Sequence, residues 1–247
     1  MKKLVLGFVV FFILALFMST GAGALTIDDS TYGATTYYGG VIHGDWDDYI
    51  GSGFRVRDLT VTQGATHTTV VLTGLYFTTG YATGASPYGN IGDLYISTGG
   101  WKVSNTVDPV HFRYDTFVAS EGWNYVITYN DPKIYPLNNF GGIIYSSNEG
   151  GAWGGEYRSG QAYRGGYLDG SAFPGVVTVE LDSASGTLTF IFPNLGNVDW
   201  MGYHWTMACG NDVVEGGGTP VPEPATMLLL GSGLLGLAGY AKKRFKK

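Results

Sequence analysis

The chain has 247 residues, 40 of them glycine, with a hydrophobic fraction of 45% and a charged fraction of only 14%. An apolar fraction of this size can build a core, which excludes a disordered chain, and the glycines follow no three-residue period, which excludes collagen. The seven basic and nineteen acidic residues between Leu25 and Thr219 give that segment a formal net charge of −12 (7 − 19), against −6 for the whole chain. Nucleic-acid binding requires basic patches, so the acidic body argues against a nucleic-acid partner.

The first 24 residues have the pattern of a secretory signal peptide. Two lysines precede an uninterrupted apolar run over residues 4–17, and the small residues Ala22 and Ala24 stand at positions −3 and −1 of a signal peptidase site. The sequence therefore predicts export, with cleavage by signal peptidase between Ala24 and Leu25. The alternative is a retained membrane anchor, which the polar residues that follow disfavour.

Residues 25–214 are predicted to form an all-β extracellular domain, because no window keeps a helical spacing of apolar residues without a Gly or Pro break. Alternating or β-branched runs predict strands over residues 54–62, 68–77, 93–97, 124–129, 176–181 and 187–192. The alternation slips near Asp58, which indicates a bulge, and residues 182–186 end in glycine, which favours a hairpin. Such a series predicts an antiparallel β-sandwich or barrel. The sandwich is the preferred prediction, of jelly-roll or LamG/concanavalin-like type, the latter by analogy of fold alone.

An acidic cluster in "HGDWDDY" suggests a metal site. Asp45, Asp47 and Asp48 bring three carboxylates together in a loop, and carboxylate oxygens are the ligands that Ca²⁺ prefers. The spacing is not that of an EF-hand. Calcium is therefore the one candidate cofactor, and the alternative is a solvated acidic loop.

A glycine-, tyrosine- and serine-rich stretch runs from residue 138 to residue 175. An unstructured loop of this length is unusual inside a compact domain, so some strand content is expected. Within it, Trp153 and Tyr157 are candidate carbohydrate-binding residues, since flat aromatic faces suit sugar rings. The alternative for each of the six tryptophans is that it fills the core.

Catalytic signals are weak. The chain has no G-x-S-x-G and no H-E-x-x-H motif, and its four histidines show no ligand spacing. Glycosidases need two carboxyl groups at a suitable distance, and nothing singles out a pair among Glu149, Glu156 and Glu180. The single cysteine, Cys209, excludes an internal disulfide and is expected to be a buried apolar residue. The sequence thus predicts no catalytic residue and no enzyme.

The C-terminus has three parts. Residues 215–224 form a Gly/Pro linker that ends in the extended run Val221–Pro222–Glu223–Pro224, which suits a protease cleft. Residues 225–241 carry no charge, and as a helix they would span about 25 Å, slightly short of a hydrocarbon core of about 30 Å. Residues 242–247 supply five positive charges, which places this tail in the cytoplasm. A transmembrane helix with the body outside is therefore predicted.

This arrangement of Pro-Glu-Pro, apolar span and basic tail resembles the PEP-CTERM sorting signal of Gram-negative surface proteins. The resemblance implies recognition by exosortase, cleavage near Pro222–Pro224, and passage from the inner membrane to the cell surface or extracellular matrix, in association with exopolysaccharide. A permanent transmembrane anchor is the alternative. The stretches "GDLYISTGGW" and "HWTMACGNDVVEGGG" also resemble parts of exported ectodomains with sorting tails, the second as the last strand and turn of the domain.

The sequence as a whole predicts an exported structural or adhesive protein of the surface or matrix. A carbohydrate-binding module, Ca²⁺-dependent or not, is the second hypothesis. A secreted glycan-active enzyme is the third.

Overall fold

The computed structural model describes residues 24–28, 55–79, 82, 91–102, 117–138, 140–145, 161–165, 171–196, 200–208, 210, 212–219 and 233. Its strands are β1 Leu25–Asp28, β2 Val56–Gln63, β3 His67–Gly74, β4 Leu94–Ser97, β5 Tyr125–Ile127, β6 Ile134–Pro136, β7 Ile143–Tyr145, β8 Ala162–Gly165, β9 Thr178–Asp182, β10 Thr187–Pro193, β11 Met201–Thr206 and β12 Val213–Gly218. All of them lie in one compact unit, Ala24–Pro220.

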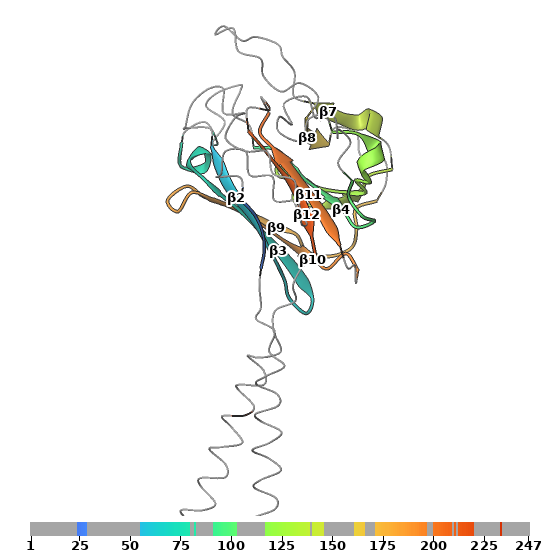
Figure 1. Ribbon diagram of the computed structural model, residues 1–247, viewed down its shortest axis with the longest axis horizontal. Helices are drawn as coiled ribbons and strands as arrows, with labels where there is room; N and C mark the ends of the chain where they lie inside the picture. Colours follow the sequence, from blue (N-terminus) through green and yellow to red (C-terminus); the bar gives the residue numbers. More distant parts are fainter. Residues whose placement is uncertain are drawn as a thin grey trace, which may run out of the picture. The chain divides into compact units, whose positions relative to one another are not determined.

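The strands form two five-stranded sheets and one two-stranded sheet, and every described pairing is antiparallel (Figure 1). Sheet A has the order β1-β2-β3-β10-β9, sheet B has the order β12-β11-β4-β5-β6, and β7 pairs with β8. The predicted all-β, antiparallel class is therefore confirmed.

Most predicted strands appear close to their predicted bounds. The register between β2 and β3 shifts between Val56 and Asp58, which confirms the predicted bulge. The β9–β10 pair closes around residues 182–186 with Gly186 at φ 70°, as expected of the predicted hairpin. Strands β7 and β8 supply the strand content expected between residues 138 and 175. Strands β1 and β6 were not predicted, and the stretch 204–218, expected to be one last strand and turn, contains the end of β11 and all of β12.

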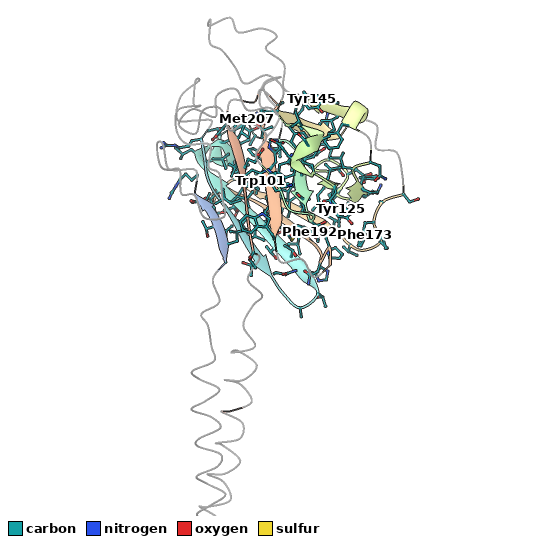
Figure 2. The ribbon with its side chains drawn as sticks, turned by 45° about the vertical axis from the view of Figure 1, so that its right-hand side comes forward. Trp101, Tyr125, Tyr145, Phe173, Phe192 and Met207 are labelled. Atoms are coloured by element: carbon teal, nitrogen blue, oxygen red, sulfur yellow. The ribbon has the colours of Figure 1, made fainter. Side chains whose placement is uncertain are left out.

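One apolar core lies between sheets A and B. Inward residues of sheet A, such as Leu72 and Phe190, share a single buried cluster with Ile96 and Trp205 of sheet B. Figure 2 shows the edge of this core, where the ring centroids of Tyr125 and Phe173 lie 6.3 Å apart. Period-two alternation thus places one face of each sheet against the other.

A second apolar cluster covers the outer face of sheet B. It joins Tyr95 of β4 to Trp101, Phe117 and Trp123 from the neighbouring loops and to Ala162 of β8. The small β7–β8 sheet lies on this side of sheet B (Figure 1). Sheet B is therefore buried on both faces along β4, β11 and β12, whose residues are all buried, while β5 and β6 at its edge are partly exposed.

The last strand corrects the predicted linker. Residues 215–218, predicted to be the flexible start of a linker, are the last four residues of β12 and are buried. A Cβ at Gly216 would lie 2.9 Å from the Ile27 side chain, and one at Gly218 would lie 2.5 Å from the Leu25 side chain, so the glycines let β1 side chains pack directly on the β12 backbone. Antiparallel pairing with β11, which continues to Met201 opposite Gly218, thus makes a strand of a run that composition alone assigns to a linker.

The described helices are the short 3-10 segments η3 Leu75–Thr78, η5 Ala119–Glu121 and η6 Phe140–Gly142. No helix among the described residues is long and apolar enough to cross a membrane. Apart from Ala24 and Gly233, the predicted signal peptide and apolar span lie outside the described residues.

Candidate functional site

The body's two ends meet at one edge of the fold. Ala24 is exposed and Leu25 begins β1, directly after the predicted signal-peptide cleavage site. The Leu25 side chain lies against Gly218, the final residue of β12. Both predicted processing segments therefore attach to the same end of the body. Ala22 and the motif Val221–Pro224 lie outside the described residues.

The predicted ligand sites fall mostly outside the described ranges. Asp45, Asp47 and Asp48, and the aromatic pair Trp153 and Tyr157, belong to the segments that the structure does not describe. Within the described ranges, no group of three His, Cys, Asp or Glu side chains could hold a metal ion. The calcium and aromatic sites thus stay predictions.

Three tryptophans fill the interior. Trp101, Trp123 and Trp205 expose 8%, 3% and 0% of their surface, so the core-filling alternative is correct for them. Trp200 is half-buried. A stacking platform for sugars therefore cannot be built from the three buried rings.

A buried polar cluster ties the second apolar layer to sheet B. His204 of β11 pairs in register with Glu215 of β12, and its Nδ1 lies 2.7 Å from Glu215 Oε2. Its Nε2 donates to the carbonyl of Ala162 in β8 at 3.0 Å. The indole N–H of Trp101, labelled in Figure 2, donates to Glu215 Oε1 at 3.2 Å. Because a carbonyl can only accept, Nε2 carries a proton, and a second proton lies between Nδ1 and Oε2. The buried pair is therefore neutral overall.

Aromatic rings enclose this pair. The His204 ring centroid lies 4.8 Å from that of Phe117 and 5.8 Å from those of Tyr95 and Trp123. A second buried carboxylate, Glu121, accepts the indole N–H of Trp123 at 2.8 Å. Both ring nitrogens of His204 are engaged by protein groups in a fully buried site. The cluster is thus suited to holding the layers together, since buried charged groups must be paired.

Two buried aspartates anchor the stretches singled out in the sequence. Asp93 accepts the backbone N–H of Tyr129 and of Gly165, each at 2.8 Å. Burial raises the pKa of the Asp93 carboxyl to about 6, against the opposing effect of these hydrogen bonds. Asp212, in the β11–β12 turn, accepts the backbone N–H of Val56 at the start of β2. Sequence reasoning missed these anchoring roles, because the backbone partners are distant along the chain.

The outer face of sheet A is different in kind. Its outward side chains are mostly threonine, and we call this surface the threonine face. By strand, its residues are Thr26 (β1), Asp58, Thr60 and Thr62 (β2), Thr69, Val71 and Thr73 (β3), Thr187, Thr189 and Ile191 (β10), and Thr178, Glu180 and Asp182 (β9). All of these side chains are half-buried or exposed. Among the described residues, these side chains thus form one broad, partly exposed surface that carries hydroxyl groups.

Comparison with known proteins bears on the tail. A family model, the PEP-CTERM protein-sorting motif, matches residues 220–244. Neither a curated protein nor a solved structure matches this chain. The family match begins directly after the described body, and the function of the body is argued from its own geometry.

Proposed function

We propose that this chain, which carries a PEP-CTERM protein-sorting motif at residues 220–244, is a structural or adhesive protein of the cell surface or extracellular matrix. The motif implies an exported protein that is transiently anchored at the membrane and has exosortase as a partner. In the proposal, exosortase cleaves near Pro222–Pro224 and the body enters an exopolysaccharide-rich matrix. The motif is the observation that carries this proposal.

The spacing between body and motif supports cleavage close to the folded domain. Gly218 is the last residue of β12, and three residues separate it from Pro222. Four steps of extended chain reach at most about 14 Å. The protease must therefore work next to the folded body. Bulky structure at the end where β1 and β12 meet would obstruct it, so a compact end suits cleavage there.

The body's polar interior supports a structural role. The buried residues His204, Glu215 and Glu121 bond to other groups of the fold. Such a network stabilises a single packing arrangement of the layers. A jelly-roll or LamG/concanavalin-like sandwich belongs to the same proposal, and the shared core of two antiparallel sheets supports it.

The sorting proposal is tested by replacing Pro222, Glu223 and Pro224 with alanine in the native host. We expect the variant to stay in the membrane fraction at full length, because the protease has lost its recognition sequence. Thr219→Ala with Thr226→Ala changes residues on both sides of the motif and should be processed normally. Release of the triple variant at the normal rate would contradict the proposal.

A carbohydrate-binding module remains the second candidate function. The observation that favours it is the threonine face, a wide surface of hydroxyl groups on an exported domain.

A further inference from the structure

The threonine face forms a regular grid. The register aligns its side chains in three ranks across β2, β3, β10 and β9, namely Asp58–Thr73–Thr187–Asp182, Thr60–Val71–Thr189–Glu180 and Thr62–Thr69–Ile191–Thr178. Neighbouring strands lie about 4.8 Å apart, and successive outward residues of one strand lie about 6.8 Å apart. The hydroxyl groups therefore repeat in two directions over four strands.

Most hydroxyl groups of this grid are uncommitted. Thr73 donates to Asp58 at 3.0 Å, and Thr187 contacts the Ser185 hydroxyl at 2.9 Å. In the part of the chain that the structure describes, the side-chain hydroxyls of five others bond to no protein group; these are Thr60, Thr62, Thr69, Thr178 and Thr189. Each free hydroxyl offers one donor and two acceptor positions, which is also the hydrogen-bonding pattern of a sugar hydroxyl.

The charges around the grid exclude several partners. Glu180 and Asp182 border it on β9, Asp58 borders it on β2, and none of the positions of the threonine face is Lys or Arg. Nucleic acids and anionic polysaccharides would meet three carboxylates on this face, and the exposed Arg57 in the adjoining bulge of β2 offsets only one of them. A second copy docked by the same face would bring the same carboxylates together. Protein partners are bound mainly through aromatic and Arg anchors, and the threonine face has none.

We propose that the threonine face binds an uncharged polysaccharide chain. This inference rests on the proposed matrix role, and it specifies the class of ligand that the protein binds in the matrix. Hydroxyls of the polymer replace water on the threonine hydroxyls, while the threonine methyl groups, with Val71 and Ile191, contact the C–H faces of the sugar rings. Each contact is weak, and affinity comes from the many that a long chain makes at once.

The test compares two triple variants of the full chain, purified in mild detergent. Thr62→Val, Thr69→Val and Thr189→Val remove three free hydroxyls while keeping shape and strand preference. Thr62→Ser, Thr69→Ser and Thr189→Ser keep the hydroxyls and remove the methyl groups. The probes are four uncharged polysaccharides (cellulose, curdlan, dextran and mannan), with alginate as the anionic comparator, in a co-sedimentation or affinity-gel assay.

We expect the unmodified chain to bind at least one uncharged probe more tightly than alginate. The valine variant should bind that probe about tenfold or more weakly, and the serine variant within about threefold of the unmodified chain. Equal melting temperatures of the three proteins would show that the loss concerns the surface. The polymer assay is done in solution, so a failure of sorting in cells leaves its result unchanged, and the two proposals fail separately.

Four results would overturn the inference. They are no binding to any of the uncharged probes, a preference for alginate, equal binding by the valine variant, and self-association that the valine variant abolishes in the absence of polysaccharide binding. The last result would assign the face to a second copy of the chain.

Discussion

The outer faces of the two sheets differ in burial, although both sheets contribute their inner faces to the same core. On sheet B, the outward residues Tyr95 and His204 are fully buried beneath a layer of aromatic rings. On sheet A, outward residues such as Thr69 and Thr189 are only half-buried. The alternation that fills the central core also leaves each sheet a second face. One of these faces contributes to stability, and the other is free to contact a ligand.

The comparison also separates two kinds of carboxylate. Glu215 on sheet B is 1% exposed and bonds to His204 and Trp101, whereas Glu180 on sheet A is exposed. A buried carboxylate must be paired, while an exposed one is already solvated by water. The same substitution should therefore lower the free energy of unfolding more on the buried face of sheet B than on the outer face of sheet A.

The largest expected effect is that of Glu215→Leu. It removes the partner of His204 and leaves buried donors without an acceptor, and the loss of one member of a buried pair costs about 3–5 kcal/mol. Glu180→Leu, on the open face, should change the free energy of unfolding by about 0.5 kcal/mol or less. Denaturant unfolding of the full chain measures both, and equal losses would contradict the distinction between the two faces.

The second effect is a pH dependence set by Asp93 of the buried sheet. Burial raises the pKa of its carboxyl from 3.8 to about 6, so the folded state favours the protonated form. Stability should therefore fall as the pH rises from about 4 to about 6, by an amount on the order of 3 kcal/mol. Unfolding measured across this range should show the slope for the unmodified chain and a much flatter profile for Asp93→Asn. A slope that persists in the variant would assign the titration to another group.

A smaller effect tests the close backbone contacts of sheet B. A Cβ at Gly92 would lie 1.9 Å from the backbone oxygen of Thr206, whereas one at Gly99 would meet nothing within 4 Å. Gly92→Ala should cost about 1–3 kcal/mol, because backbone must move, and Gly99→Ala should be close to neutral. Thermal unfolding of the two variants gives the comparison. Similar melting temperatures would mean that β4 and β11 separate easily.

The smallest effect concerns the stability contribution of the open face. Thr69→Val and Thr189→Val should each change the free energy of unfolding by about 0.5 kcal/mol or less, since neither hydroxyl bonds to a protein group in the described part of the chain. Chemical denaturation is again the measurement. A loss above about 1 kcal/mol for either variant would mean that these hydroxyls support the fold and would weaken the case for a binding face.

The strand pattern could be predicted where it is local. Alternation located β2, β9 and β10, the bulge beside Asp58 and the hairpin around Gly186, because these depend on neighbours along the chain. β12 could not be found in this way. It forms by pairing with β11, and its glycines leave room for the side chains of Leu25 and Ile27, which lie nearly two hundred positions earlier in the sequence.

The candidate site residues show the same difference between local patterns, which can be predicted, and long-range contacts, which cannot. The sorting motif is a contiguous pattern and was identified from the sequence, whereas the His204–Glu215 pair was not. A signal for the pair existed, since each of the two residues stands three positions outside the connection 207–212 ("MACGND"), and an antiparallel hairpin places such residues opposite each other. The threonine face required the register of four strands, which no single stretch of sequence contains. The predicted calcium and aromatic sites lie outside the described residues.

Export and processing at the PEP motif leave a direct mark on the intact mass of the protein recovered from its native host. We expect the mass of a chain that begins at Leu25 and ends near Pro224, with or without an added group. A mass that continues through Lys247 would contradict this expectation and would show that the tail is a permanent anchor.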